Sequence, residues 1–411
     1  MTDRDRCVEF LQELIQTESP PGGEEEVAGL VREEMEELGY DRVEVDDAGN
    51  VLGLVTGRDE APAVTFNTHL DHVDAGDPEA WPHPPFGAEV HDGRVWGRGA
   101  VDIKGPLAAQ VHGVGRLADD GESPPGDVWV TATVQEEVGG LGARHLAGER
   151  DLGLVIVGEP SQNQLRRGHR GRVELQVRVR GRSAHASAPE RGANPLRVMG
   201  RFLTGLEALD HPVSPDLGPS TLVPTRLSTD QESTNVIPGE ARLTLDCRTV
   251  PGQSAGSVRE RLEPLLERSL VLGTGGEVEI PRFERVSWTG VRMTMPADNP
   301  AFLLPADHPA VRSAVETLEP HFDGQAPPVD LWTFATDGGH FAEAGATVIG
   351  LGPGEEGLAH TVEESIALED LERALDLNEV MARGWPAAAR EMEAAMVTQE
   401  EATEGDAVPG G

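Results

Sequence analysis

"APAVTFNTHLD", residues 61–71, decides the fold class, because a short apolar run in it leads directly into a histidine and an aspartate. The apolar residues are continuous, which favours a strand buried on both faces. The same texture recurs in "DVWVTATVQEE" (127–137), "LGLVIVGEP" (152–160) and "ATVIGLGPG" (346–354). Helical patterns such as "KGPLAAQVHGVGRLADDG" (104–121) separate the runs. Buried strands that alternate with helices predict an α/β fold with a mainly parallel sheet, covered on both faces.

The pattern changes near residue 172. "GRVELQVRVRG" (171–181) alternates polar and apolar residues, which is typical of a strand with one solvated face. Helical stretches at 193–209 and 254–269, with further alternating strands, predict an inserted α+β domain with a four-stranded antiparallel sheet and two helices. The predicted organisation is a discontinuous α/β domain (1–171 and 289–390, with its last helix at 368–382), an inserted domain (172–288) and an acidic, disordered tail (391–411).

The charge of the chain is strongly negative. Asp and Glu number 72 against 34 Lys and Arg, the formal net charge is -38, and Lys104 is the only lysine. Concentrated salt would screen such self-repulsion, so we expect a halophilic protein; an ordinary acidic cytosolic protein is the alternative. Nucleic acids and anionic membranes are polyanions, so we expect neither as a partner.

Cysteine content and hydropathy bear on the compartment. Cys7 and Cys247 are too few for a disulfide framework or a cysteine-based zinc site, and they fit a reducing compartment. The first residues are charged, and no apolar run approaches the 18 residues or so of a membrane span. We therefore expect neither a signal peptide nor a membrane span, and a cytoplasmic location.

Residues able to bind metal gather where the predicted strands end. Each has a plainer alternative: a lone histidine is more often structural, an aspartate before a helix can be an N-cap, and a glutamate pair can be solvated surface. We interpret His72, His83 and His91 in that plainer way. A mixed carboxylate and imidazole set suits two zinc-like ions bridged by a carboxylate. The candidates are His69 with Asp71, Asp102, the pair Glu136 and Glu137, Glu159, and His360.

The same motifs resemble a known family. "HLDHVDAGD" (69–77), "WPHPPFGAEVHDGRVWGRGAVDIKGPLAA" (81–109), "QEEVGGLGA" (135–143), "GEPS" (158–161) and "AHTVEES" (359–365) resemble the dinuclear zinc metallopeptidases that include acetylornithine deacetylase, succinyl-diaminopimelate desuccinylase, aminoacylase and glutamate carboxypeptidase. The resemblance covers about residues 8–385 and keeps the order and spacing of the motifs. It implies a zinc-peptidase-like catalytic domain carrying two zinc ions, and an inserted lid domain that forms a homodimer.

Carried over residue by residue, the resemblance implies a role for each motif residue. It implies that His69 and Glu159 bind one zinc, Glu137 and His360 bind the other, Asp102 bridges them, Asp71 supports His69, and Glu136 is the general base. It also implies a cis peptide bond after Asp102.

The two adjacent glutamates are expected to act differently. Neighbouring side chains on an extended backbone point to opposite sides, so Glu137 can face a metal while Glu136 faces the attacking water. Zinc lowers the pKa of water that it binds, and a positioned carboxylate can take the proton as hydroxide attacks a carbonyl. Glu136 would then pass this proton to the leaving amine.

The inserted domain contributes further candidates. The resemblance implies that His185, in "VRGRSAHASAPERGANP" (179–195), reaches an active site, often that of the neighbouring subunit, to stabilise an oxyanion. It also implies that Asn235 and Arg248 hold the carboxylate of the substrate. The alternatives are a turn residue for Asn235 and a surface ion pair for Arg248. "FATDGGHF" (334–341) resembles a substrate-side loop, in which we interpret His340 as structural.

These residues predict a metal-dependent amidohydrolase. We expect cleavage of the amide bond of an N-acyl amino acid, as in acetylornithine deacetylase, with a dipeptidase or carboxypeptidase of the same family as the alternative. A metal-free relative kept as a binding protein would lack a ligand or the base, whereas every motif position is filled. Zinc is the expected ion, and cobalt and manganese suit the same ligands.

Overall fold

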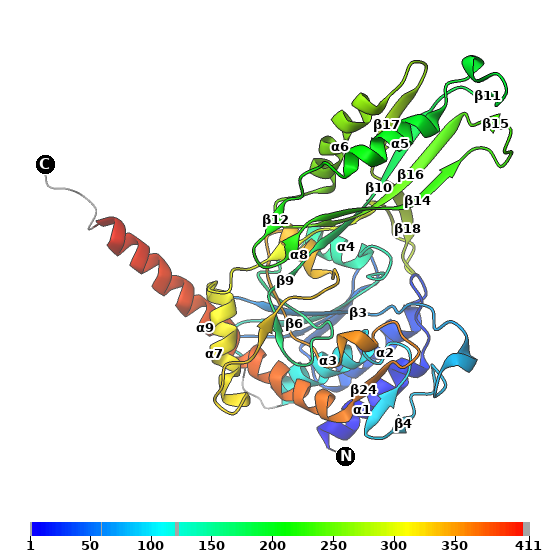
Figure 1. Cartoon of the computed structure of the whole chain (residues 1–411). Coiled ribbons are helices and arrows are strands. Elements are labelled where there is room, and N and C mark those ends of the chain that lie inside the picture. The colour runs from blue at the N-terminus through cyan, green and yellow to red at the C-terminus, as the bar shows by residue number, and fades with distance from the viewer. Residues whose placement is uncertain (1, 59, 120–122, 406–411) are drawn as a thin grey trace, which may run out of the picture.

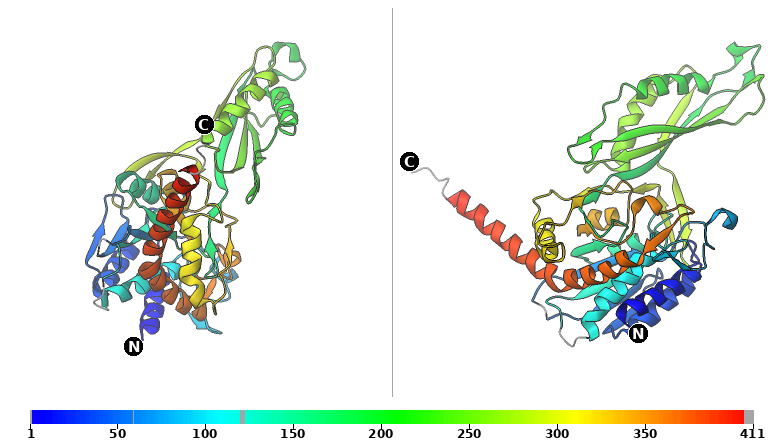
Figure 2. Two further views of the ribbon diagram at one scale, coloured as in Figure 1. Left: turned by 90° about the vertical axis from the view of Figure 1, so that its left-hand side faces the viewer. Right: turned by 60° about the horizontal axis from the view of Figure 1, so that its bottom comes forward.

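The computed structural model describes residues 2–58, 60–119 and 123–405. The chain forms a larger α/β domain and a smaller domain that projects from it, and the C-terminal part of helix α9 (Leu368–Gly405) extends away from the larger domain (Figures 1 and 2). No helix in these ranges is both long enough and apolar enough to cross a membrane.

The larger domain is built on an eight-stranded sheet. The strands follow the order β1 (Arg42–Val45), β2 (Val51–Val55), β6 (Val128–Thr133), β3 (Val64–His69), β7 (Leu154–Val157), β23 (Thr347–Gly350), β8 (Leu165–Arg166) and β22 (Val329–Asp330). The central strands β6, β3, β7 and β23 pair in parallel, and β1, β2 and β6 pair antiparallel. This confirms the mainly parallel central sheet that the buried apolar runs predict.

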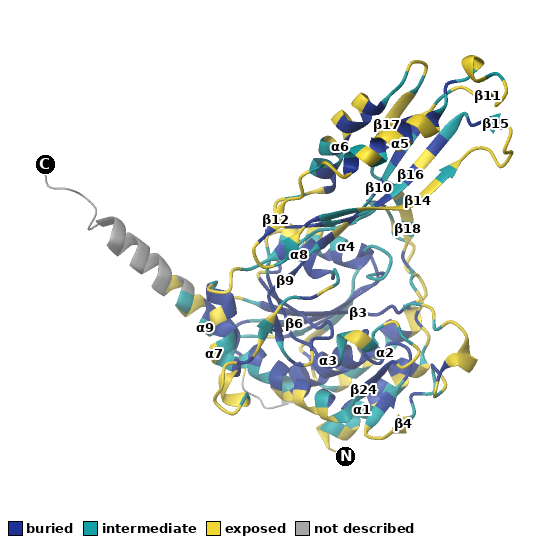
Figure 3. Cartoon of the chain, viewed as in Figure 1, coloured by how far each residue is buried: buried dark blue, intermediate teal, exposed yellow. Residues whose placement is uncertain are grey.

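Helices cover both faces of this sheet, and strand β7 shows how the faces divide. Leu154 and Ile156 pack in one core cluster, whereas Val155 and Val157 pack in another, because successive side chains of a strand point to opposite faces. The first cluster includes residues of α1 (Asp3–Gln16), α2 (Glu25–Glu37), α3 (Lys104–Asp119), α7 (Pro309–Leu318) and α9 (Leu368–Gly405); the second includes residues of α4 (Leu141–Glu149) and α8 (Gly338–Glu343). Figure 3 shows buried residues, in dark blue, along the central sheet and on the helices that pack against it.

The smaller domain, called the lid below, is an antiparallel sheet with helices on one face. Its strands follow the order β14 (Thr221–Thr229), β16 (Glu240–Thr249), β10 (Gly171–Arg180) and β17 (Gly275–Glu279), and β20 (Asp298–Asn299) pairs with β10 as a fifth strand. Helices α5 (Pro195–Leu206) and α6 (Ala255–Ser269) pack in one apolar cluster with β10 and β16. Because β20 follows residue 288, the sheet takes one more strand than the four predicted, from beyond the predicted boundary.

Short paired strands complete the described chain. Strand β5 (Arg94–Trp96) lies between β4 (Val90–His91) and β24 (Ser365–Ala367) and pairs with both. The other pairs are β9 (Gly168–His169) with β21 (Phe302–Leu303); β11 (Ala184–His185) with β15 (Val236–Ile237); β12 (Val213–Ser214) with β13 (Gly218–Pro219); and β18 (Arg282–Val286) with β19 (Arg292–Pro296). The β18–β19 hairpin lies between the lid and the larger domain (Figure 1).

The C-terminal region differs from its prediction. Helix α9 runs from Leu368 to Gly405 and contains Pro386, so residues 391–405 are helical where a disordered tail was predicted. The prediction of disorder rested on the polar, acidic composition of this segment, but its alanine and glutamate residues are also good helix formers. The last part of the predicted tail, 406–411, lies outside the described residues.

Candidate metal centre

The candidate ligands lie at one edge of the central sheet. His69 is the last residue of β3, Glu159 follows β7 by two residues, and Glu137 follows β6 by four. His360 lies in the loop after β23. Because β3, β6, β7 and β23 run parallel, the loops after them meet at the same edge, where ligands of α/β sheets bind.

Two groups of ligand atoms share Asp102. In the first, Nε2 of His69 lies 3.1 Å from Oδ1 of Asp102 and 3.5 Å from Oε1 of Glu159. In the second, Nε2 of His360 lies 3.0 Å from Oδ2 of Asp102 and 2.9 Å from Oε1 of Glu137. Each oxygen of Asp102 therefore faces a different group, which is the arrangement of a bridging carboxylate.

The separations fit metal ions. Zinc bonds to nitrogen and oxygen are about 2.1 Å, so ligand atoms around a tetrahedral ion stand about 3.4 Å apart. The separations of 2.9 to 3.5 Å in both groups are close to that value. The side chains of His69, Asp102, Glu137 and Glu159 are each at most 10% exposed, so bulk water does little to solvate their charges.

The electrostatics of the ligands also call for cations. Burial, followed by the nearby charge of Asp102, raises the pKa of Glu159 to about 7. The same two causes raise the pKa of Glu137. Hydrogen bonds to Asp102 and Glu137 raise the pKa of His360 to about 10. Three carboxylates thus lie close together in a poorly solvated site, where their negative charges repel one another. Bound divalent ions would supply the positive charge that stabilises the ionised forms.

Asp71 supports the centre in two ways. Nδ1 of His69 lies 3.0 Å from the backbone oxygen of Asp71 and 3.3 Å from its carboxylate, so the ring can donate from Nδ1 and keep Nε2 for a metal. The Asp71 carboxylate also accepts hydrogen bonds from the backbone N–H groups of Glu136, at 3.0 Å, and Glu137, at 3.2 Å. Sequence reasoning missed this second contact, because it joins residues 65 positions apart.

The backbone of the glutamate pair is a turn, so the argument from an extended strand was wrong. Strand β6 ends at Thr133, Gln135 has a φ of 57°, and the N–H of Gly139 donates to the carbonyl oxygen of Glu136 at 3.0 Å. The pair is therefore oriented by the turn and by Asp71, rather than by the alternation of a strand.

Glu136 lies in a poorly solvated part of the site. Burial, followed by the negative charge of Asp337, raises its pKa well above the usual value for a glutamate. Asp337 accepts a hydrogen bond from Oγ1 of Thr133 at 2.9 Å. A carboxyl group whose pKa rises toward neutrality is suited to general acid–base work. Asp337 was noticed only as part of a loop motif, and its influence on Glu136 was missed.

Glu364 is a buried residue that the sequence did not single out. Its Oε1 accepts hydrogen bonds from the backbone N–H groups of Val101 and Asp102, at 3.0 and 3.1 Å, and its Oε2 pairs with Nη1 of Arg98 at 2.5 Å. The guanidinium of Arg98 lies over the ring of Trp81. The peptide bond between Asp102 and Ile103 is cis, as the resemblance implies.

The lid candidates lie in two different places. His185 on β11 and Asn235 beside β15 are neighbours, and the N–H of Ala186 donates to the backbone carbonyl oxygen of Asn235 at 2.8 Å. Figure 1 shows β11 and β15 at the outer end of the lid, so one chain does not bring them to the metal ligands. Arg248 instead lines a pocket together with Glu136 and Glu137.

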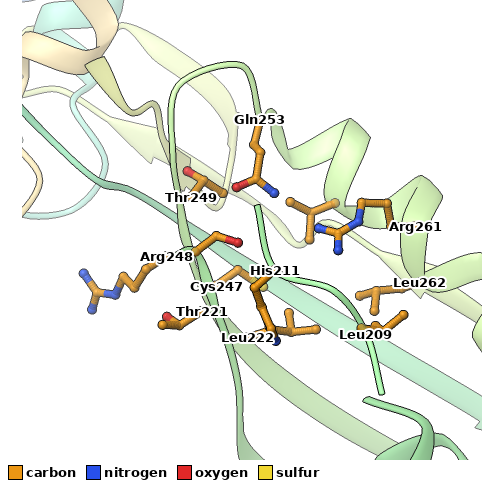
Figure 4. Close-up of a pocket in the computed structure, with 12 residues that line it drawn as sticks. Leu209, His211, Thr221, Leu222, Cys247, Arg248, Thr249, Gln253, Arg261 and Leu262 are labelled. Carbon is orange, nitrogen blue, oxygen red and sulfur yellow. The ribbon is translucent and has the colours of Figure 1, made fainter. Parts of the chain in front are cut away.

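Arg248 also borders a second pocket, which lies within the lid. That pocket is small, with a volume of about 10 Å³, and is lined by residues such as Leu209, Gln253 and Arg261. Figure 4 shows the guanidinium of Arg248 pointing away from these side chains. The Nε of Arg248 donates to Asp246 at 2.9 Å, which is the ion pair that the alternative interpretation expects. Arg248 nevertheless also lines the pocket beside Glu136.

A third group of possible ligands, His83, Glu89 and His91, lies outside this centre. The two imidazole rings are stacked, with centroids 4.0 Å apart and planes only 13° from parallel. A metal bound to imidazole lies in the plane of the ring, so stacked rings cannot direct both lone pairs at one ion. Glu89 instead accepts a hydrogen bond from Nε2 of His91 at 2.7 Å.

Two curated proteins align with most of this chain. It is 32% identical over 361 residues to "Uncharacterized protein YgeY" of Escherichia coli, covering 86% of this chain and 88% of that protein. It is 30% identical over 386 residues to succinyl-diaminopimelate desuccinylase of Halorhodospira halophila, covering 89% of this chain and 94% of that protein.

A solved structure shares the fold. The metallo-carboxypeptidase of the M20 family from Sulfolobus solfataricus superposes with a TM-score of 0.73 at 18% identity, covering 93% of this chain and 99% of that one. The model of Peptidase family M20/M25/M40 matches residues 65–383, which include every candidate metal ligand. The chain therefore belongs to peptidase family M20/M25/M40 and is a metal-dependent hydrolase of amides or peptides.

Proposed function

We propose that this enzyme cleaves the amide bond of an N-acyl amino acid, in the manner of a deacylase. The observation that carries the proposal is the placement of Asp102, whose two oxygens face separate ligand groups next to Glu136. In this assignment the ligands of one ion are His69, Asp102 and Glu159, and those of the other are Asp102, Glu137 and His360.

Glu136 is the proposed general base. When bound, the two ions, zinc or in its place cobalt or manganese, polarise the amide carbonyl and make water more acidic. Glu136 takes the proton of the attacking water and returns it to the leaving amine. Asp71 fixes the turn that carries Glu136 and holds the ring of His69, and Glu364 holds the backbone of Asp102.

The substrate carries a free carboxylate in this proposal. Arg248 offers a guanidinium fork beside the metal centre, and such a fork suits a carboxylate. The similarity to the succinyl-diaminopimelate desuccinylase of Halorhodospira halophila, which aligns over most of both chains, supports an N-acyl amino acid as the substrate. A dipeptidase or carboxypeptidase is the second candidate, favoured by the fold shared with the Sulfolobus solfataricus carboxypeptidase.

We also propose a homodimer through the lid. His185 and Asn235 lie at the outer end of the lid, where only another chain could bring a metal centre to them. Strand β14 is an edge strand whose residues are mostly exposed, including Val223 and Leu227 at nearly half of their surface. An exposed edge strand is a template for pairing with a second chain.

We also propose, from the composition of the chain, that the protein is cytoplasmic and works in concentrated salt. Cys7 and Cys247 are both buried thiols without a disulfide, which fits the cytoplasm. The net charge of -38 fits a protein that works in concentrated salt.

A substrate panel tests the function. Purified protein, loaded with zinc or cobalt in molar salt, would be given N-acetyl amino acids, N-succinyl amino acids and dipeptides, and the released amine measured. The proposal expects turnover of N-acyl amino acids that a chelator abolishes. Turnover of dipeptides alone would instead favour the second candidate.

A further inference from the structure

A pocket lies between the metal centre and the lid. It has a volume of about 370 Å³ and is open to solvent. Glu136 and Glu137 line it from the metal centre, Arg172 and Arg248 line it from the lid sheet, and Arg285 lines it from β18. A chain with more than twice as many acidic as basic residues thus places three arginines around one pocket next to its reactive groups.

Arg172 and Arg248 form a pair across two strands. They stand directly opposite each other in the register of β10 and β16, an arrangement that is destabilising for like charges. The two oxygens of Asp246 accept from the two Nε atoms, each at 2.9 Å. The single carboxylate therefore fixes both guanidinium planes but compensates only one of the two positive charges.

Arg285 approaches the pocket from another element. Its Nε donates to the carbonyl oxygen of Val138, the residue after the candidate ligand Glu137, at 3.2 Å. Its guanidinium carbon lies 4.7 Å from the centre of the Phe283 ring. Across the described parts of the chain, Arg285 forms no ion pair, and the Nη atoms of all three arginines make no hydrogen bond. Each fork is thus held by its Nε and keeps its outer N–H groups for a ligand.

The carboxylates near the three arginines carry too little negative charge to neutralise them. Asp246 is shared as described, and Asp298 pairs with Arg144 at 2.7 Å. Glu174 is the remaining carboxylate that lines the pocket outside the metal centre. Three guanidinium groups therefore face two carboxylates, an excess of one positive charge. The outer N–H groups that are open to a ligand lie in two places, at the Arg172–Arg248 pair and at Arg285.

From this arrangement we infer that the pocket binds a substrate with two anionic groups. The Arg172–Arg248 pair takes the carboxylate of the amino acid, and Arg285 takes a second carboxylate close to the scissile amide. The inference rests on the proposed function for the position of the scissile bond. It narrows the substrate class to N-acyl amino acids with a second carboxylate, on the acyl group or on the amino-acid side chain.

Binding measured without turnover tests this inference separately from the reaction. Calorimetric titrations would use zinc-loaded Glu136→Gln protein with N-acetylalanine, N-succinylalanine and N-acetylglutamate. We expect at least one of the two dianions to bind about tenfold or more tightly than the monoanion, because a charge-assisted fork contributes that much. Arg285→Gln in the same background should remove this advantage and change N-acetylalanine binding less than about threefold.

The matched control is Arg282→Gln, which removes one positive charge from the same strand at an exposed residue outside the pocket lining. It should leave the dianion preference unchanged. Equal binding of all three ligands, or a preference that survives Arg285→Gln, would overturn the inference. If the preference appears while wild-type enzyme hydrolyses no N-acyl amino acid, the proposed function fails and the dianion site stands.

Discussion

The carboxylate of Glu364 accepts a hydrogen bond from the backbone N–H of Asp102 at 3.1 Å, so the segment that carries His360 also holds the residue shared by both ligand groups. The second oxygen of Glu364 pairs with Arg98, and both side chains are almost completely buried. The position of the bridging carboxylate thus depends on a contact between residues 262 positions apart.

Replacing Glu364 by glutamine should weaken metal binding and stability together. The amide leaves the buried guanidinium of Arg98 without a counter-charge, and breaking such a pair costs about 3 kcal/mol or more. Loss of a group that orients metal ligands lowers metal affinity by about tenfold to a hundredfold. Urea unfolding and zinc titration measure the two effects. Glu363→Gln, at the exposed neighbouring residue, should change neither. Unchanged zinc affinity in Glu364→Gln would contradict the role of Glu364.

The adjacent glutamates should separate chemistry from metal binding. Glu136→Gln removes the proposed base, and we expect kcat to fall by about a hundredfold or more with two ions still bound per chain. Glu137→Ala removes a candidate ligand of His360's ion, and elemental analysis should show lower metal occupancy. Activity of Glu136→Gln near the wild-type level would reject the base, and full occupancy in Glu137→Ala would reject the ligand.

His169 should make the fold sensitive to acid. Burial lowers its pKa to about 4, and its Nε2 accepts the N–H of Thr336 at 3.1 Å, which requires the neutral ring. The ordinary histidine pKa is about 6.5, so on acidification the unfolded chain binds a proton at this residue before the folded chain does. The contribution of His169 to the free energy of unfolding is therefore complete above pH 6.5 and falls as the pH drops toward 4. At pH 5 the loss should be about 2 kcal/mol.

Urea unfolding of the wild type and of His169→Gln at pH 7.5 and pH 5 measures this contribution. The variant should be less stable at pH 7.5 but lose less stability on acidification. An equal loss of unfolding free energy in both proteins would show that other groups account for the acid sensitivity.

A mixture of two inactive variants should recover activity if the lid works across a dimer. His185→Ala keeps its own Glu136, and Glu136→Gln keeps its own His185, so a mixed dimer contains one complete site. Random exchange of subunits should restore about a quarter of wild-type activity. No recovery after demonstrated subunit exchange would mean that His185 does not act across the dimer.

How much the sequence predicted depends on the range of the interaction. His69, Asp102, Glu159 and His360 could be found because each lies at or after a buried strand, and parallel strands bring such positions to one edge. The turn at Glu136 could not be found, because Gln135 has a positive φ that no glycine signals.

Contacts between distant segments were also missed, namely those of Asp71 with Glu136 and of Glu364 with Asp102. Neither leaves a local pattern, because each joins a common acidic side chain to a backbone N–H. Helix α9 was predicted too short because the polar, acidic composition of the last residues favoured disorder, although the same residues include good helix formers such as alanine and glutamate.

Anomalous diffraction from crystals grown with zinc tests the two-metal centre most directly. We expect two peaks about 3.5–4 Å apart on either side of Asp102, the usual spacing of a bridged pair. His69 and Glu159 should contact one peak, and Glu137 and His360 the other. A single peak at these residues, or zinc at His83 and His91 with none at Asp102, would contradict the account.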